Sequence, residues 1–139
     1  MKLRTEQVTW QDSRALLATI RVEVFVHEQG VPIDEEWDAL DEVSRHWLVY
    51  EPEQKTIATA RLTPNGQIGR MAVLAAHRSK GVGFDLLQVV VNEARLHFDQ
   101  VYLHAQSHAI GFYQRAGFVA HGPEFEEAGI MHQKMLLVF

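Results

Sequence analysis

The chain of 139 residues contains no cysteine. This absence excludes a disulfide framework, a thiolate zinc site and a cysteine nucleophile. Long apolar runs are also missing, since none approaches the roughly 18–20 residues of a membrane-spanning helix. The first residues lack the apolar core of a signal peptide. We therefore expect a cytoplasmic protein that has no membrane partner.

The chain has fewer basic than acidic residues: 13 lysines and arginines against 18 aspartates and glutamates, which gives a net charge of -5. A nucleic-acid partner is not expected, since its binding rests on many phosphate contacts. The net charge does not exclude a small anionic ligand, because a few backbone amides and one or two cationic side chains can bind it. The eight histidines show no paired metal-ligand spacing, so we expect no catalytic metal. The length suits one domain over residues 1–139.

The pattern of apolar residues and turn signals predicts an α+β fold. Thr9 and Asp12 mark a helix start, and Pro64-Asn65-Gly66 marks a tight turn between two strands. We expect a mostly antiparallel sheet with helices on both faces and one parallel pair, joined by a crossover helix. The expected strands cover residues 2–8, 47–50, 56–63, 67–74, 101–105, 118–120 and 130–139. The first expected helix runs from its cap at Thr9 and ends near Gln29-Gly30. The other expected helices cover residues 84–98 and 108–116.

A glycine-containing loop between a strand and an amphipathic helix is the clearest candidate site. The first N–H groups of a helix lack intrahelical partners and carry partial positive charge. Glycines let the backbone approach a phosphate closely, and neighbouring cations add charge. The spacing differs from the dinucleotide fingerprint and from the nucleotide-triphosphate loop. The residues of this loop are Arg78, Ser79, Lys80, Gly81, Val82 and Gly83.

This loop resembles the acetyl-CoA signature of the GCN5-related N-acetyltransferases. The segment 112–118, Phe-Tyr-Gln-Arg-Ala-Gly-Phe, resembles the downstream block of that family. In the N-terminal half, residues 21–32 resemble the ElaA- and YjcF-like branch, as do Asp38, Asp41, His46 and the segments 105–106 and 125–132. The resemblance implies the family fold, acetyl-CoA as donor and a cytosolic enzyme. It does not supply the acceptor, which we expect to be a small-molecule or peptide amine.

The resemblance also implies roles for residues outside the loop. Backbone groups of Met71, Ala72 and Val73 are expected to face the pantetheine arm, where one N–H can act as an oxyanion donor. Gln106 stands where many members have Asn and is expected to bind the pantetheine amides. Tyr113 is the expected general acid for the leaving thiolate. Phe112 is expected to be a core aromatic that also borders the coenzyme.

The base that deprotonates the acceptor is left open among three residues: Glu28, His46 and His132. Each can act directly or through a water. His104 lies on a strand expected to be central, so we interpret it as a satisfied core histidine. Arg21 interrupts an apolar helix and is expected to pin the acidic segment 34–42 by pairing with Glu23, Asp38 or Asp41. That segment is expected to be a solvated loop with at most a short helical turn, or else a negative rim that attracts a cationic acceptor.

Two other functions stay open at this stage. One alternative is an acyl-homoserine-lactone synthase, because eight residues loosely resemble the N-terminal pattern of those enzymes. They are Arg21, Val24, Phe25, Glu36, Asp38, Asp41, Arg61 and Leu62. The intact loop favours free coenzyme A over the carrier protein that such a synthase uses. The third interpretation is a non-catalytic acyl-CoA-binding module, against which both glycines and Tyr113 argue. The last strand, if exposed, is open to pairing in a homodimer.

Overall fold

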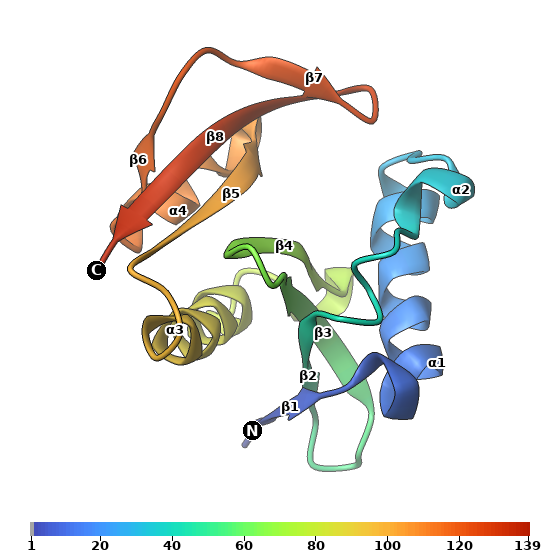
Figure 1. The fold of residues 1–139 in the computed structure, drawn as a ribbon. Helices are drawn as coiled ribbons and strands as arrows, with labels where there is room; N and C mark the ends of the chain where they lie inside the picture. The colour runs from blue at the N-terminus through green and yellow to red at the C-terminus, as the bar shows by residue number, and fades with distance from the viewer. Residues whose placement is uncertain (1) are drawn as a thin grey trace.

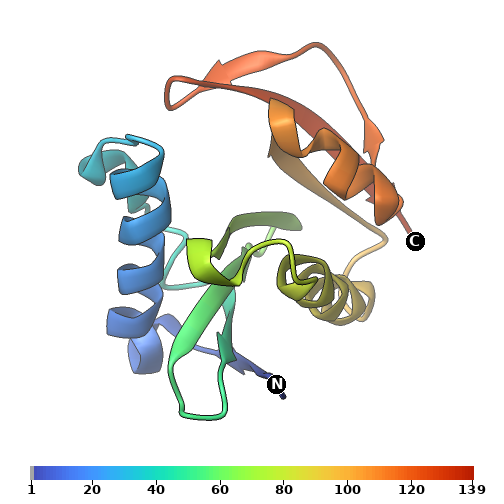
Figure 2. The ribbon, with the colours of Figure 1, turned by 180° about the vertical axis from the view of Figure 1, so that it is seen from behind.

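The computed structural model describes residues 2–139 and contains one mixed sheet with helices on both faces (Figures 1 and 2). The strands are β1 (Arg4–Val8), β2 (Arg45–Tyr50), β3 (Thr56–Leu62), β4 (Gln67–Val73), β5 (Gln100–Gln106), β6 (Val119–Ala120), β7 (Phe125–Glu127) and β8 (Ile130–Val138). The helices are α1 (Trp10–Arg21), η1 (Val22–Glu28), α2 (Ile33–Glu36), η2 (Ala75–His77), α3 (Val82–Arg95), η3 (Ser107–Ala109) and α4 (Ile110–Arg115).

The sheet order is β1-β2-β3-β4-β5-β8-β6, with β7 paired to β8. All neighbours are antiparallel except β4 and β5. α1 covers one side of β2–β4, and α3 covers the other (Figures 1 and 2). The expected α+β fold with its single parallel pair is therefore confirmed.

Two apolar clusters hold the layers together. The larger one joins the inner face of α3 to the sheet and extends to α4. The smaller one joins Leu17, Ile20 and Val24 of α1 and η1 to Leu48 and Ala72 of the sheet. α1 begins as predicted, because the side chain of Thr9 accepts a hydrogen bond from the Asp12 N–H at 3.1 Å.

Three elements differ from the sequence prediction. The first helix ends near Gln29 as expected, but its last part, η1, is a π-helix, which the apolar spacing does not distinguish from an α-helix. β7 was not expected, because its three residues lie between turn-forming segments. The acidic segment contains the short helix α2, as expected, but its Glu36 and Asp41 are buried rather than solvated. No helix among residues 2–139 is long and apolar enough to cross a membrane.

Candidate active site

β4 and β5 separate soon after they meet. They pair only at Gln67 with Tyr102 and at Ile68 with Leu103. Beyond these pairs β4 bulges: its register against β3 shifts, and Arg70 has φ of 47°. The two strands therefore form a V whose apex lies at the Ile68–Leu103 pair.

The backbone of β4 presents polar groups to this gap. Ala72 pairs with β3, and the N–H of Leu74 donates to Ile57 at 2.9 Å. Since successive residues of a strand point their N–H and C=O groups to opposite sides, those of Met71 and Val73 face the gap. Arg78 Nε donates to the Val73 carbonyl at 2.9 Å, which agrees with this direction. Met71 and Val73 therefore offer amides to a bound chain, whereas Ala72 does not.

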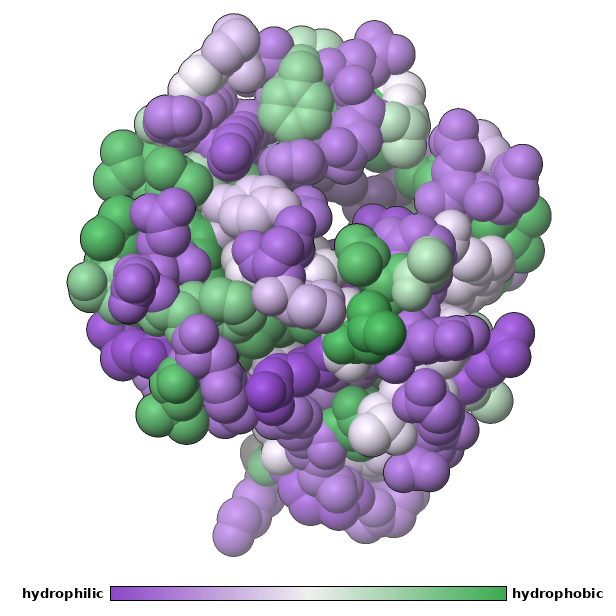
Figure 3. Space-filling view, in the orientation of Figure 1, coloured by the Kyte–Doolittle hydropathy of each residue, from purple (hydrophilic) through white to green (hydrophobic). Residues whose placement is uncertain are grey.

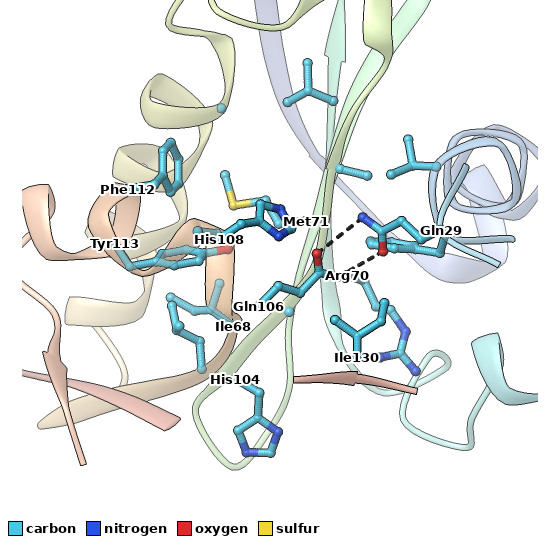
Figure 4. Close-up of a pocket in the computed structure, with 18 of the residues that line it drawn as sticks. Gln29, Ile68, Arg70, Met71, His104, Gln106, His108, Phe112, Tyr113 and Ile130 are labelled. Carbon is cyan, nitrogen blue, oxygen red and sulfur yellow. Dashed lines mark hydrogen bonds between the residues drawn. The ribbon is translucent and has the colours of Figure 1, made fainter. Parts of the chain in front are cut away.

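A cavity of about 830 Å³ occupies the gap. It opens between β7–β8 and the α2 side of the molecule (Figure 3), and its lining side chains come from both arms of the V (Figure 4). Most of the expected coenzyme-binding residues line it: Met71, Ala72, Val73, Arg78, Ser79, Gly81, Val82, Gly83, Gln106 and Phe112. Lys80 is exposed on the loop and does not line the cavity.

The N-terminus of α3 points its free amides at this cavity. Gly81 caps the helix with φ of 82°, a left-handed conformation that favours glycine, and no side chain accepts from the first turn. The first helix bond runs from the Asp85 N–H to the Gly81 carbonyl, so the N–H groups of Val82, Gly83 and Phe84 lack intrahelical partners. A helix of 14 residues adds partial positive charge at this end. This arrangement suits a phosphate or pyrophosphate.

Arg78 forms an ion pair with Glu28 of η1. Its two terminal nitrogens each lie 2.8 Å from a carboxylate oxygen of Glu28, at the end of η1. Glu28 itself does not line the cavity. Glu28 was expected as a candidate base, but in this structure it binds the signature arginine instead, in a bidentate ion pair.

Tyr113 lies on α4, and its hydroxyl points toward the middle of the cavity (Figure 4). Phe112 and Phe118 pack edge-on against its ring, with centroids at 5.0 and 6.0 Å. Burial raises the pKa of Tyr113 to about 12. The phenol therefore stays protonated at any working pH and can donate a hydrogen bond into the cavity.

Gln106 reaches across the cavity to Gln29. Its Nε2 donates to Gln29 Oε1 at 2.8 Å, and Gln29 Nε2 donates back at 3.4 Å (Figure 4). The pair joins the end of β5 to the residue after η1. Gln106 is thus placed beside the gap as expected, but with a protein partner.

The two histidines expected as candidate bases lie in different places. His46 is 1% exposed, packs against Trp10 and bonds the Asp41 carbonyl at 2.8 Å, away from the cavity. Burial lowers the pKa of His46, which keeps it neutral. His132 does line the cavity; its Nδ1 donates to the Ile130 carbonyl at 2.7 Å and its ring stacks on Phe125.

Arg21 pins the acidic segment, as expected, through a buried network. It bonds Glu36 at 2.7 Å and Asp41 at 2.8 Å, while Arg61 bonds Asp41 at 3.0 Å. Burial raises the pKa of Glu36. Burial also acts to raise the pKa of Asp41, but the hydrogen bonds and charge of Arg21, with those of Arg61, outweigh it and hold that pKa below its usual value. Asp38 is paired as well, with Arg61 and Arg70, so three of the six carboxylates in this segment are neutralised by arginines.

Other cavity residues were not expected from the sequence. His104, predicted as a core histidine, keeps 26% of its side chain exposed and lines the cavity beside Glu127. His108 and Arg115 line it as well. Arg115 follows Tyr113 by two positions within the downstream block, and this proximity to the motif was the signal that could have identified it.

The comparisons with known proteins agree with this geometry. Residues 6–139 match the acetyltransferase (GNAT) domain family. The uncharacterized N-acetyltransferase YjcF of Bacillus subtilis is 38% identical over 122 residues, which are 84% of this chain and 86% of that protein. Protein ElaA of Escherichia coli is 34% identical over 125 residues, with coverage of 84% and 81%.

Solved structures give the same answer. An acyl-CoA N-acyltransferase from Pseudomonas aeruginosa superposes with a TM-score of 0.84 at 35% identity, covering 97% of this chain and 99% of that one. The crystal structure of Escherichia coli ElaA superposes with a TM-score of 0.86 at 28% identity, with the same coverage. With its signature loop, split strands and matching relatives, the chain belongs to the GNAT family of N-acetyltransferases.

Proposed function

We propose that the protein transfers the acetyl group of acetyl-CoA to the amine of a small molecule or peptide, by direct attack in a ternary complex. One observation carries the proposal: the free amides at the start of α3 and the backbone groups of Met71 and Val73 border one cavity. The first set suits the pyrophosphate, and the second suits the amides of an extended pantetheine arm. No covalent enzyme intermediate is required.

The thioester lies near the apex of the V in this proposal. An N–H of the β4 bulge, with Met71 the candidate, donates to the thioester oxygen and stabilises the charge that develops on it. Tyr113 donates to the sulfur as the C–S bond breaks. A phenol with a pKa of about 12 acts here as a hydrogen-bond donor that need not lose its proton completely.

The acceptor approaches from the side on which α2 and β7 lie. Glu35 and Glu127 line the cavity there, and neither has a partner arginine or lysine among residues 2–139. Two exposed carboxylates favour a cationic acceptor such as an amine in its ammonium form. The buried carboxylates of the Arg21 network contribute little, because their charges are paired.

A thiol-release assay tests this function. Acetyl-CoA is incubated with a panel of aminoglycosides, polyamines, amino acids and peptides with free N-termini, and release of coenzyme A is followed. We expect saturable turnover with at least one amine and an acetylated product by mass spectrometry. Acetyl-CoA binding without turnover on any amine would favour a non-catalytic acyl-CoA-binding module instead.

A further inference from the structure

A histidine and a carboxylate form a pair on the acceptor side of the sheet. His104 Nδ1 lies 3.0 Å from Glu127 Oε2, and both residues line the cavity. We propose that His104, positioned by Glu127, is the base that removes the proton from the acceptor's ammonium group. This inference rests on the proposed N-acetyl transfer and assigns a residue that the sequence pattern indicated to be structural.

The His104–Glu127 pair is built by the fold rather than by a single helix. Two other histidines contact carboxylates at 3.1 Å, His27 with Glu23 and His97 with Glu93, but each pair is spaced i,i+4 and lies outside the cavity. His77 lines the cavity, but its Nε2 lies 3.7 Å from Glu51, beyond hydrogen-bond distance. His104 and Glu127 lie 23 residues apart, on β5 and β7. This pair therefore needs β8 between its two strands to bring it together.

The β7–β8 hairpin sets the position of Glu127. Glu127 pairs with Ile130, and the two residues between them, Ala128 and Gly129, have φ of 53° and 78°. Positive φ at both central residues is the pattern of a tight type I′ turn. Phe125, two residues before Glu127 on the same face, packs edge-on against the His104 ring at 5.0 Å. The imidazole is thus held by a carboxylate and an aromatic ring from one strand.

The place of His104 relative to the V supports the role of base. Leu103 is the last residue of β5 paired with β4, and His104 is the next residue, with its side chain on the opposite face. Tyr113 packs with the cluster that contains Leu103, on the other face. Figure 4 shows His104 at the lower end of the cavity and Tyr113 to one side. A base and an acid on opposite faces suit an amine that arrives from one face and a thiol that leaves on the other.

The hydrogen bond also determines which nitrogen is free. Glu127 accepts from the Nδ1–H of a neutral His104, so Nε2 carries the lone pair. No residue among 2–139 bonds this Nε2, and it is not fully buried. Glu127 also stabilises the imidazolium that forms, as the carboxylate of a catalytic triad does. Lys134 lies opposite His104 in the register of β5 and β8.

His132 is the rival base, and two differences favour His104. The Nδ1 of His132 donates to a carbonyl oxygen, so no carboxylate stabilises its protonated form. His132 also pairs with Gln106, two positions farther than His104 from the apex of the V. A base at that position lies along the pantetheine arm rather than beside the expected thioester.

The acceptor ammonium gives one proton to Nε2 of His104, and the free amine attacks the carbonyl carbon of the thioester. As the C–S bond breaks, the second amine proton passes to the departing thiolate through the Tyr113 hydroxyl. The products are the amide, coenzyme A as its thiol and one proton, which His104 passes to water.

Two small acceptors separate this role from a structural one. Methylamine is protonated at neutral pH and needs a base, whereas hydroxylamine is already neutral. We expect His104→Gln to lower kcat/KM for methylamine about 10²-fold or more but to change the value for hydroxylamine by less than about 3-fold. In this variant the methylamine rate should simply rise with pH, because only the free amine that forms in solution can then react. Glu127→Gln should also lower kcat/KM for methylamine more than for hydroxylamine, because His104 loses the carboxylate that orients it.

His97→Gln is the matched control, since it removes a histidine–glutamate pair of similar length, 3.1 Å, outside the cavity. This variant should have the wild-type kcat/KM for both acceptors and the wild-type pH profile. Calorimetry should show acetyl-CoA bound equally well by wild type and His104→Gln. If the wild type acetylates neither probe, the proposed function fails. If the wild type is active and His104→Gln lowers kcat/KM equally for both acceptors, or if His132→Gln alone shows the selective loss for methylamine, the assignment of His104 is wrong.

Discussion

Gln29 and Gln106 exchange hydrogen bonds across the cavity, at 2.8 and 3.4 Å, although they lie 77 residues apart in the sequence. The pair occupies the amide of Gln106 that we expect to bind the pantetheine arm. Bound coenzyme therefore has to replace this contact, at a cost close to that of one hydrogen bond, about 0.5–1.5 kcal/mol.

Gln29→Ala should consequently tighten binding of coenzyme A about 2- to 12-fold, because Gln106 is then free. Gln106→Ala should weaken it by a similar factor. Isothermal titration of coenzyme A into the two variants measures both changes. Equal losses in both variants would mean that Gln29 itself binds the coenzyme or holds its site together.

The two glycines of the signature loop should respond differently to alanine. A Cβ on Gly83 lies 3.5 Å from Val73 and 3.6 Å from Phe112, which is ordinary contact, and its φ is unstrained. The free energy of unfolding of Gly83→Ala should therefore stay within about 0.5 kcal/mol of the wild-type value. Acetyl-CoA binding should weaken at least 10-fold, because the methyl group meets the phosphates.

Gly81→Ala is the counterpart of that variant. Its added Cβ meets nothing within 4 Å, but its φ of 82° strains any other residue by about 1–2 kcal/mol. Denaturant unfolding should show this loss of stability. A Gly83→Ala protein that is well folded and binds acetyl-CoA normally would show that the loop holds no phosphate.

Arg78 and Glu28 make a testable pair at the same site. If the guanidinium turns from Glu28 to a phosphate when coenzyme A binds, Glu28→Gln should tighten binding and Arg78→Ala should weaken it by about 1–3 kcal/mol. The loss in Arg78→Ala should shrink as salt rises and vanish for pantetheine, which lacks phosphates. An equal loss for pantetheine would assign Arg78 to the structure of β4, where it already binds the Val73 carbonyl.

Sequence patterns predicted most of the fold and the coenzyme side of the site, for physical reasons. The strands around the Pro64-Asn65-Gly66 turn and the helix after Gly81 follow from local propensity and apolar spacing. The π-helix 22–28 does not, since its apolar spacing also fits an α-helix. The Glu28–Arg78 and His104–Glu127 pairs depend on strand register and helix packing, which one sequence does not reveal.

The buried network around Arg21 should govern stability rather than coenzyme binding. Asp41→Asn leaves Arg21 and Arg61 short of a buried counter-charge and should cost about 3 kcal/mol or more. Asp38→Asn is the control, because that carboxylate is 35% exposed and its loss should cost less than about 1 kcal/mol. Urea unfolding measures both, and comparable losses would contradict the central position of Asp41.

Asp41 also makes the stability of the fold depend on pH. Since the pKa of Asp41 is lowered on folding from its usual 3.8, its stabilisation is present above pH 4 and is lost as the pH falls through the folded value. Burial raises the pKa of Glu36, so the contribution of Glu36 to stability grows as the pH falls. The difference between wild type and Asp41→Asn should therefore narrow on acidification below pH 4, and a constant difference would contradict this account.

Tyr113→Phe keeps the ring and removes only the hydroxyl. We expect kcat to fall about 10²-fold with little change in the Michaelis constant for acetyl-CoA. Because folding raises the pKa of Tyr113 to about 12, wild-type stability should decline as the pH rises above 10, where the unfolded phenol ionises. The variant should lack this part of the decline. A fully active variant would remove Tyr113 from the mechanism.

A crystal structure of the protein with acetyl-CoA would show where the donor binds. We expect the pyrophosphate on the amides of Val82 and Gly83, the pantetheine arm between β4 and β5, and the thioester sulfur within hydrogen-bonding reach of the Tyr113 hydroxyl. Acetyl-CoA bound elsewhere, or a cavity that stays empty at millimolar acetyl-CoA, would contradict this prediction.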